Sequence, residues 1–225
     1  MLTIVLAASE LEKIPSSIFS HPAITSYANQ RNKKPEQMIL DSNYHHNAMK
    51  NLLEGDRRGR PDIVHMFLLT SLESIANKEG KLKVIVHTRN NEAVYVNPKT
   101  RIMRNYSRFI GLVEQIFEKK SITTQNETLI ELHENITLDK IIKQEKTDVV
   151  IVFSPDGKKV KLTNFFKDIK KKKQENILCI IGGFPKGDFH FDFSKTSYNV
   201  VSIYDKPLTA WTVTGEVLVN YNLVF

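Results

Sequence analysis

Short apolar runs alternate with segments of helical periodicity along most of this chain. The runs have the length of strands and few polar residues, as in strands that are buried on both faces. They comprise residues 2–8, 83–88, 93–97, 148–153, 177–181 and 200–204. Apolar strands that alternate with helices predict an α/β fold, with a mainly parallel sheet flanked by helices.

Helix signals accompany the strands. Pro61 suits the first position of a helix, because a proline there leaves no amide hydrogen unpaired, and Asp62 favours the positive helix start. Asn105 is suited to cap a second helix, whose apolar residues recur at helical spacing as far as Lys119. The remaining predictions are helices over 163–173 and 207–219, an irregular stretch over 13–36, and a polar bridge over 121–147 that holds a short strand and a helix.

Composition adds little to this picture. The chain has 225 residues, of which 41% are hydrophobic and 25% charged, as in ordinary globular proteins. No internal boundary is visible, so one domain over 1–225 is expected. Cys179, the one cysteine, lies in an apolar run, which fits a reducing compartment, and we expect a cytoplasmic protein. No apolar stretch approaches the ~20 residues of a membrane span, and the first run resembles a strand more than a signal peptide.

The arginines are concentrated in one part of the chain. Seven of the eight lie between Arg57 and Arg108, whereas the 24 lysines are spread over the whole sequence. Residues 57–120 carry 13 Lys and Arg against 6 Asp and Glu, so the whole net charge of +7 arises there. Arginine grips phosphate and base edges at two points, whereas lysine acts as a solvated point charge. An Arg-rich segment at about 57–108 therefore predicts a surface that binds nucleic acid.

Turn residues follow three neighbouring strands of the predicted sheet. Gly182–Gly187 follows one strand, Ser202–Leu208 follows the next, and Ser154–Gly157 follows the one before. Ligands of open α/β sheets lie at the carboxyl ends of the strands, and glycine lets the backbone approach a ligand closely. The spacing matches neither a P-loop nor a dinucleotide fingerprint. The three turns together predict a pocket.

A second group of polar residues suggests different chemistry. It consists of two carboxylates and three histidines: Asp41, His45, His46, Asp62 and His65. Histidine and carboxylate suit zinc or manganese, and a metal-dependent hydrolase is the function that they would support. Adjacent histidines point in different directions, however, and both aspartates have good positions as helix caps. We therefore expect no metal site.

The motifs, taken together, resemble the family of ribosome-biogenesis methyltransferases that act on N1 of pseudouridine. This family comprises an essential nucleolar protein and its archaeal relatives. The resemblance covers nearly the whole chain, and several long motifs in one order are far more specific than any single pattern. The motifs are Leu40–Met49, Arg58–His65, His87–Asn91, Arg101–Gly111, Gly182–Gly187 and Val201–Leu208.

The resemblance implies a fold and a cofactor. The fold is that of the SPOUT superfamily, an α/β domain with a C-terminal trefoil knot, here at about 148–225, that works as a homodimer. General rules of chain topology disfavour a knot, so this expectation rests on the resemblance alone. The cofactor would be S-adenosyl-L-methionine, held in the knot loops mainly by backbone groups, with Ser154 as a further contact. The matching positions are Gly182, Gly187, Ile203, Tyr204, Asp205, Lys206, Pro207 and Leu208.

The resemblance also assigns roles to the arginines. Those that match RNA-contacting positions of the family are Arg60, Arg101, Arg104 and Arg108. Asp62 matches the residue that steadies Arg60, and a lasting ion pair with Arg60 would make Asp62 a weak base. Arg57, Arg58 and Arg89 are left with a general electrostatic attraction to RNA.

The expected reaction is methyl transfer from S-adenosylmethionine to N1 of a pseudouridine in small-subunit ribosomal RNA. Pseudouridine is joined to its ribose through carbon, so its N1 carries a hydrogen and is free to be methylated. The protein would mainly hold sulfonium and nitrogen in line, with Asp62 orienting Arg60 rather than acting as a base. The alternative is an RNA-binding ribosome-assembly factor that does not catalyse.

Overall fold

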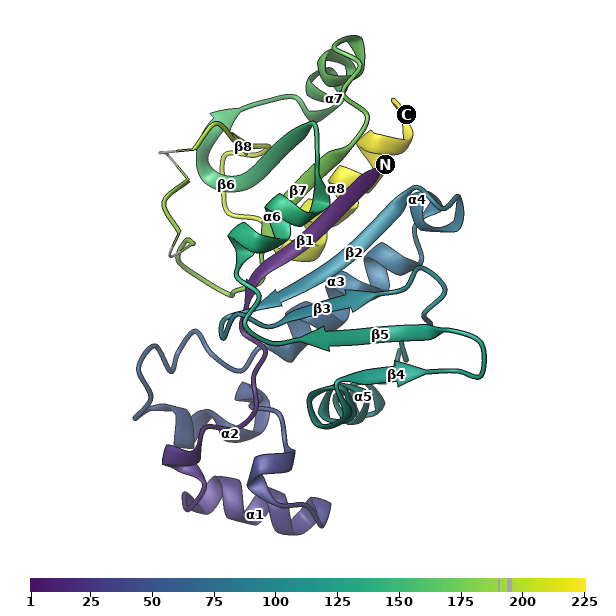
Figure 1. The fold of residues 1–225 in the computed structure, drawn as a ribbon. Coiled ribbons are helices and arrows are strands. Elements are labelled where there is room, and N and C mark those ends of the chain that lie inside the picture. The colour runs from purple at the N-terminus through teal and green to yellow at the C-terminus, as the bar shows by residue number, and fades with distance from the viewer. Residues whose placement is uncertain (190, 194–195) are drawn as a thin grey trace.

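One sheet runs through the whole protein. The structure, a computed structural model, describes residues 1–189, 191–193 and 196–225. Eight strands are ordered β4-β5-β3-β2-β1-β7-β6-β8 (Figure 1). They are β1 (Leu2–Ser9), β2 (Leu82–Thr88), β3 (Ala93–Val96), β4 (Ser121–Thr123), β5 (Thr128–His133), β6 (Val149–Lys159), β7 (Ile177–Gly182) and β8 (Asn199–Ser202).

The first strand lies in the middle of the sheet and is parallel to both of its neighbours. Leu2–Leu6 of β1 lies beside residues 82–86 of β2 on one side and residues 177–181 of β7 on the other. β6 and β8 continue the parallel part, whereas β3, β5 and β4 are antiparallel. The predicted α/β fold with a mainly parallel sheet is confirmed.

Helices cover both faces of the sheet. Residues of α3, α5, α7 and α8 share one hydrophobic cluster with the strands, and residues of α6 share a second cluster on the opposite face. α1 and α2 form a small lobe beyond the end of β1, with an apolar cluster of its own (Figure 1). The helices are α1 (Pro22–Arg31), α2 (Ser42–Met49), α3 (Pro61–Leu72), α4 (Ile75–Lys78), α5 (Tyr106–Lys119), α6 (Leu138–Glu145), α7 (Leu162–Lys171) and α8 (Ala210–Asn222), with 3₁₀ turns at Ser16–Ile18 and Pro35–Gln37. None in the described ranges is long and apolar enough to cross a membrane.

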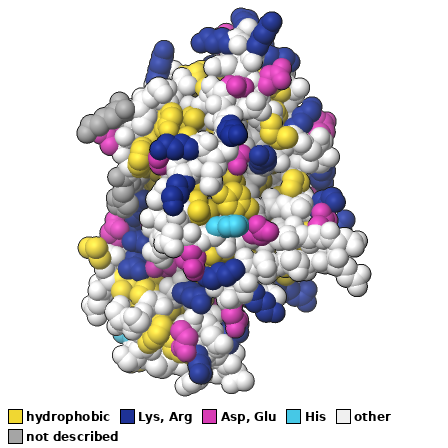
Figure 2. All heavy atoms as spheres, viewed as in Figure 1, with side chains coloured by type: hydrophobic (Ala, Val, Ile, Leu, Met, Phe, Trp, Pro, Cys, Tyr) yellow, Lys and Arg dark blue, Asp and Glu magenta, His cyan; other side chains and the backbone are white. Residues whose placement is uncertain are grey.

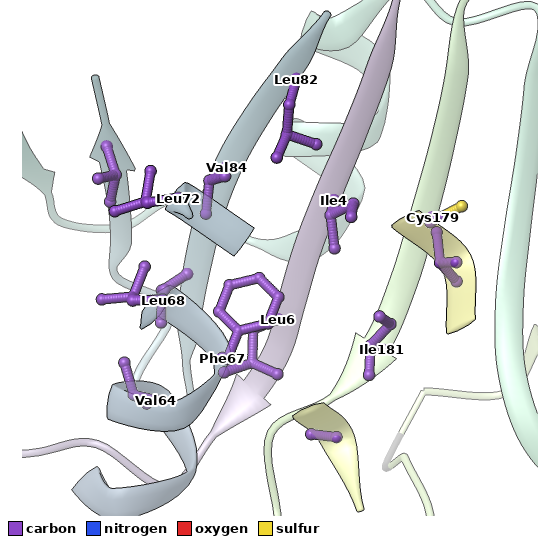
Figure 3. Packing of buried hydrophobic residues seen from close by; sticks show 14 of the residues in the cluster. Ile4, Leu6, Val64, Phe67, Leu68, Leu72, Leu82, Val84, Cys179 and Ile181 are labelled. Carbon is purple, nitrogen blue, oxygen red and sulfur yellow. The ribbon is translucent and has the colours of Figure 1, made fainter. Parts of the chain in front are cut away.

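The packing of α3 fixes the start of that helix against the centre of the sheet. Phe67 points toward Leu6 of β1, and Val64 and Leu68 belong to the same hydrophobic cluster as the strands (Figure 3). The Phe67 side chain is fully buried, which stabilises the fold by about 1.5–3 kcal/mol. Because α3 begins at the pocket described below, this packing also holds one wall of the pocket in place.

The prediction that residues 13–36 are irregular is wrong. They contain the ten-residue helix α1. Pro22 occupies its first turn, and Nδ1 of His21 accepts a 3.2 Å hydrogen bond from the N–H of Ala23. The helix ends before Asn32, whose φ of 50° is left-handed. The three prolines suggested interruption, but Pro22 stands where proline favours a helix start.

β6 is also longer than predicted. It continues to Lys159 through residues 154–157, which we expected to form a turn. Its register with β8 shifts after Phe153, so these residues form a bulge inside the strand. A Cβ atom on Gly157 would lie 2.5 Å from the backbone of Val201, so only glycine permits this close approach.

Candidate functional site

A pocket of about 480 Å³ lies at the carboxyl ends of β7 and β8 and beside the bulge inside β6. The ends of β7 and β8, the segments that follow them and residues 153–155 of β6 form most of its walls, so the pocket lies where the three groups of turn residues predict it, although the first group belongs to a bulge. Arg60 and Ile63, from the start of α3, form another part of the lining. A cavity of this size, with mainly apolar walls and a few polar groups, suits a small organic ligand.

The loop after β7 folds tightly because of its glycines. A Cβ atom on Gly182 would lie 2.6 Å from the ring of Phe184, and one on Gly183 would lie 2.4 Å from Oγ of Ser9. Gly187 has a φ of +78°, in the left-handed region that glycine adopts without strain. Substitution at any of these positions would therefore move the pocket wall.

The segment after β8 forms a second wall. Ser154 and seven of the eight motif positions predicted to contact a cofactor line the pocket, namely Gly182, Gly187, Ile203, Tyr204, Lys206, Pro207 and Leu208. Asp205 is not among the lining residues and forms an ion pair with Lys159 instead. Oγ of Ser202 donates a 2.8 Å hydrogen bond to the C=O of Tyr204 and so shapes this turn. That the eight predicted residues contact a cofactor stays a prediction.

Sequence reasoning does not single out several residues of the pocket. Asp188, directly after the last loop glycine, contributes a carboxylate to the lining. Its Oδ1 accepts a 2.8 Å hydrogen bond from the N–H of Phe189, and its Oδ2 lies 3.4 Å from Oγ of Ser154. Phe184, Phe189 and Trp211 add aromatic surface. Phe184 and Phe189 belong to a stretch rich in phenylalanine after β7, but this richness does not show which rings face a cavity.

Arg60 lines the pocket from the N-cap position of α3. Its Nε and Nη2 donate to the two carboxylate oxygens of Asp62, at 2.8 and 2.7 Å. These hydrogen bonds raise the pKa of the Arg60 guanidinium, against the opposing effect of burial. The two side chains are 29% and 36% exposed, so the pair contributes little to stability. Its main effect is to fix the direction of the guanidinium group.

The carboxylate of Asp41 lies close enough to the Arg60–Asp62 pair to interact with it electrostatically. Asp41 caps α2 by accepting the N–H of Asn43 at 2.9 Å, and it accepts a 2.7 Å hydrogen bond from the hydroxyl of Tyr106. Burial raises the pKa of Asp41, and the negative charge of Asp62 adds to the rise. Burial, followed by the hydrogen bond to Asp41, also raises the pKa of Tyr106, which therefore stays a donor. This hydrogen bond ties the start of α5 to the start of α2.

The other three arginines predicted to contact RNA lie together before and within the first turn of α5. Arg101 and Arg104 belong to the segment that leads into the helix, and the N–H of Arg108 donates to Oδ1 of the cap residue Asn105 at 3.0 Å. All three arginine side chains are exposed. After the nearby Lys78, Arg104 and Arg101 help to lower the pKa of Glu73. Their contact with RNA stays a prediction.

Arg57, Arg58 and Arg89 have carboxylate partners inside the fold, and their general electrostatic attraction to RNA stays a prediction. Nε of Arg57 donates to one carboxylate oxygen of Glu10 at 2.8 Å, and Arg89 binds the other at 2.5 Å. Arg58 binds both oxygens of Glu12, at 2.8 and 2.7 Å. These partners are 46 to 79 residues apart in sequence, so no local pattern shows them. On the face in Figure 2, lysines and arginines are likewise interspersed with acidic side chains.

The residues that a metal-dependent hydrolase would need have separate partners. Nδ1 of His45 accepts the N–H of Asp41 at 3.0 Å, and burial lowers the pKa of this histidine to about 4. His65 lies 2.7 Å from the C=O of Met103, and His46 is exposed. Within the described ranges, no three histidine, cysteine or acidic side chains converge as metal ligands do.

Fold and pocket define an α/β protein that binds a small ligand at the carboxyl ends of parallel strands, beside an arginine fixed by a carboxylate. Comparison with known families agrees with this class. The family described as EMG1/NEP1 methyltransferase matches residues 4–222. The chain therefore belongs to the EMG1/NEP1 methyltransferase family, which confirms the resemblance drawn from the motifs.

Its relatives match over nearly their whole length. The ribosomal RNA small subunit methyltransferase Nep1 of Thermococcus onnurineus is 49% identical over 221 residues, which cover 98% of each chain. The protein of the same name from Pyrococcus furiosus is 48% identical over 98% of this chain and 96% of its own. The crystal structure of Archaeoglobus fulgidus Nep1 bound to S-adenosylhomocysteine is 36% identical, with a TM-score of 0.87 over 99% of this chain and 97% of that one.

Proposed function

We propose that the protein transfers a methyl group from S-adenosyl-L-methionine to N1 of a pseudouridine in small-subunit ribosomal RNA, and so takes part in small-subunit biogenesis. Family membership and the names of the relatives support this function. The observation that carries it is the position of Arg60, which belongs to the Arg-rich segment and also lines the pocket. A methyl donor in the pocket would thus lie beside a side chain suited to hold RNA.

The pocket fits S-adenosylmethionine in size and chemistry. Gly182, with residues 203–204 and 206–208, would hold it through backbone and apolar contacts, and Phe184 and Trp211 offer aromatic surface. Asp188 adds negative charge, which favours a ligand that carries cationic groups. When bound, the cofactor supplies an electrophilic methyl group on a sulfonium sulfur. The Archaeoglobus fulgidus relative was crystallised with S-adenosylhomocysteine, the product of that chemistry.

The arginines would place the RNA. Arg60, Arg101, Arg104 and Arg108 would bind its backbone so that N1 of the target base lies in line with the methyl group. An unpaired, flipped-out base satisfies this geometry most readily. Both oxygens of Asp62 already accept hydrogen bonds from Arg60, so we assign Asp62 to orienting that arginine rather than to accepting the N1 proton.

A direct assay tests the reaction. The protein is incubated with cofactor labelled in its methyl group and with two short hairpins that differ only in carrying uridine or pseudouridine. We expect label in the pseudouridine hairpin alone, and label in the uridine hairpin would refute the substrate. Calorimetric titration with S-adenosylmethionine covers the alternative. No heat of binding at millimolar cofactor would leave an RNA-binding assembly factor as the function.

We also propose that the protein is a cytoplasmic homodimer, and that its last part, at about 148–225, is knotted as in SPOUT methyltransferases. The dimer is supported by apolar side chains that stand exposed on two helices in contact, α4 and α8. Ile75 of α4 is 62% exposed, Val219 of α8 is 58% exposed, and Leu223, directly after α8, is 70% exposed. Exposed apolar side chains that gather in one patch often mark a protein–protein interface. The proposed knotted segment includes residues 190, 194 and 195, which lie outside the described ranges.

A further inference from the structure

A buried arginine packs against the loop after β7 from outside the pocket. Arg57 is 6% exposed, and its guanidinium carbon lies 4.0 Å from the ring centroid of Phe184. Its Nη1 donates a 3.0 Å hydrogen bond to the C=O of Asp188, and a Cβ atom on Gly187 would lie 3.1 Å from the same nitrogen. Phe184, Gly187 and Asp188 all line the pocket, whereas Arg57 does not. Arg57 therefore acts on the pocket only through the loop.

Glu10 holds Arg57 in this place. The side chain of Glu10 is 2% exposed, and its carboxylate is shared between Arg57, at 2.8 Å, and Arg89, at 2.5 Å. Removing one member of such a buried group would leave an uncompensated charge. The arginine is thus confined between a fixed carboxylate and the loop.

The backbone of Glu10 connects the same loop to the opposite side of the site. Its N–H donates to the C=O of Gly183 at 3.1 Å, and its C=O accepts the N–H of Arg60 at 2.8 Å. Gly183 belongs to the loop after β7, and Arg60 is the arginine that lines the pocket from α3. One residue therefore sets the spacing between the pocket loop and the proposed RNA-binding side chain.

We infer that Arg57, held by Glu10, is a positioning residue that sets the conformation of the pocket loop, and through it cofactor affinity and alignment. The inference rests on the proposed function, because it takes the cofactor to lie in this pocket. The planar guanidinium spans the Phe184 ring and the Asp188 carbonyl at once. A lysine would keep the positive charge beside Glu10 but would lose the two-sided contact, since an ammonium is a compact, strongly hydrated point charge.

The substitution Arg57→Lys tests this role, with Arg58→Lys as a matched control. Arg58 is the next residue, is 13% exposed and is likewise paired with a buried glutamate, but its hydrogen bonds go to Glu12 and to the C=O of Leu53. We expect Arg57→Lys to weaken S-adenosylhomocysteine binding at least tenfold by calorimetry, with RNA affinity unchanged within twofold. Hydrogen exchange of the amides of residues 182–189 should become faster. Arg58→Lys should change neither the affinity for S-adenosylhomocysteine nor the hydrogen exchange of these amides.

Each outcome is decisive. Unchanged cofactor affinity in Arg57→Lys, or equal losses in both variants, would overturn the positioning role. So would a lowered melting temperature in Arg57→Lys with cofactor binding intact, which is the result of a purely structural ion pair. If the unaltered protein binds no S-adenosylhomocysteine, the proposed function fails. In that case the hydrogen exchange of residues 182–189 still tests the positioning role. Faster exchange in Arg57→Lys but not in Arg58→Lys supports this role, and unaltered exchange refutes it.

Discussion

Arg104 differs from Arg57 and Arg58 in being exposed, so its charge is available to an RNA phosphate. We expect Arg104→Ala to weaken RNA binding and to reduce the slope of log affinity against log salt concentration by about one, because one fewer phosphate is neutralised. Filter binding at several salt concentrations measures both quantities. Lys167→Ala, an exposed cation on α7, serves as the control and should leave the slope unchanged. An unaltered slope in Arg104→Ala would remove this arginine from the phosphate contacts.

Substitution of Asp62 distinguishes between two roles of its carboxylate, which either orients Arg60 or accepts the N1 proton. Asp62→Asn keeps the shape of the side chain but removes the charge and one of the two acceptors for Arg60. We expect the rate of single-turnover methylation to fall about tenfold through lost alignment, with cofactor affinity unchanged. The rate should keep its dependence on pH. If the substitution instead abolishes the acidic limb of the pH–rate profile, Asp62 is the general base and the assignment as an orienter is wrong.

His45 makes the stability of the α1–α2 lobe depend on pH. Burial lowers its pKa to about 4, below the ordinary value of 6.5, so the unfolded chain binds more protons between these values. The free energy of unfolding should therefore be highest above pH 6.5 and fall as pH decreases toward 4, by up to about 3 kcal/mol. Urea unfolding at several pH values measures this slope. His45→Gln should flatten it, whereas His46→Gln, at the exposed neighbouring histidine, should not.

At the scale of elements, the loop after β7 depends on glycine more strictly than the helices do. Gly182→Val should abolish cofactor binding while RNA binding survives, because its side chain would displace the Phe184 ring from the pocket wall. Gly111→Ala in α5 is the contrasting change, since its Cβ would meet nothing within 4 Å. It should stabilise the protein by about 0.5–1 kcal/mol. Calorimetry and thermal unfolding test both, and parallel loss of RNA binding in Gly182→Val would show that the variant is misfolded.

Elements with a strong local signal were predictable from the sequence. The apolar runs predict β1 and β7, and the cap residue Asn105 predicts the start of α5. Each of these predictions needs only the local sequence and no knowledge of what the element packs against. The continuation of β6 was not predictable, because pairing with β8 extends that strand through a proline and a glycine. The place of the pocket followed from the rule for strand ends. The pairing of Glu10 with Arg57 did not, since it joins side chains 47 residues apart.

At the scale of the whole molecule, oligomeric state is the property most open to test. We expect sedimentation equilibrium to give a dimer, and Val219→Glu to shift it toward the monomer, because a charge would be buried in the proposed interface. Lys167→Glu, at an exposed polar position of α7, is the control for added negative charge and should leave the dimer intact. A monomeric unaltered protein would refute the dimer without touching the pocket.

The central place of β1 has a consequence for synthesis. β1 is made before both of its neighbours in the sheet, which begin only at Leu82 and Ile177. At about 5–20 residues per second, β7 follows β1 after roughly 9–35 s. During that time an apolar strand has at least one edge open to pairing with other chains. The sheet, the glycine loop and the pocket are therefore completed together, once β7 and β8 have been made.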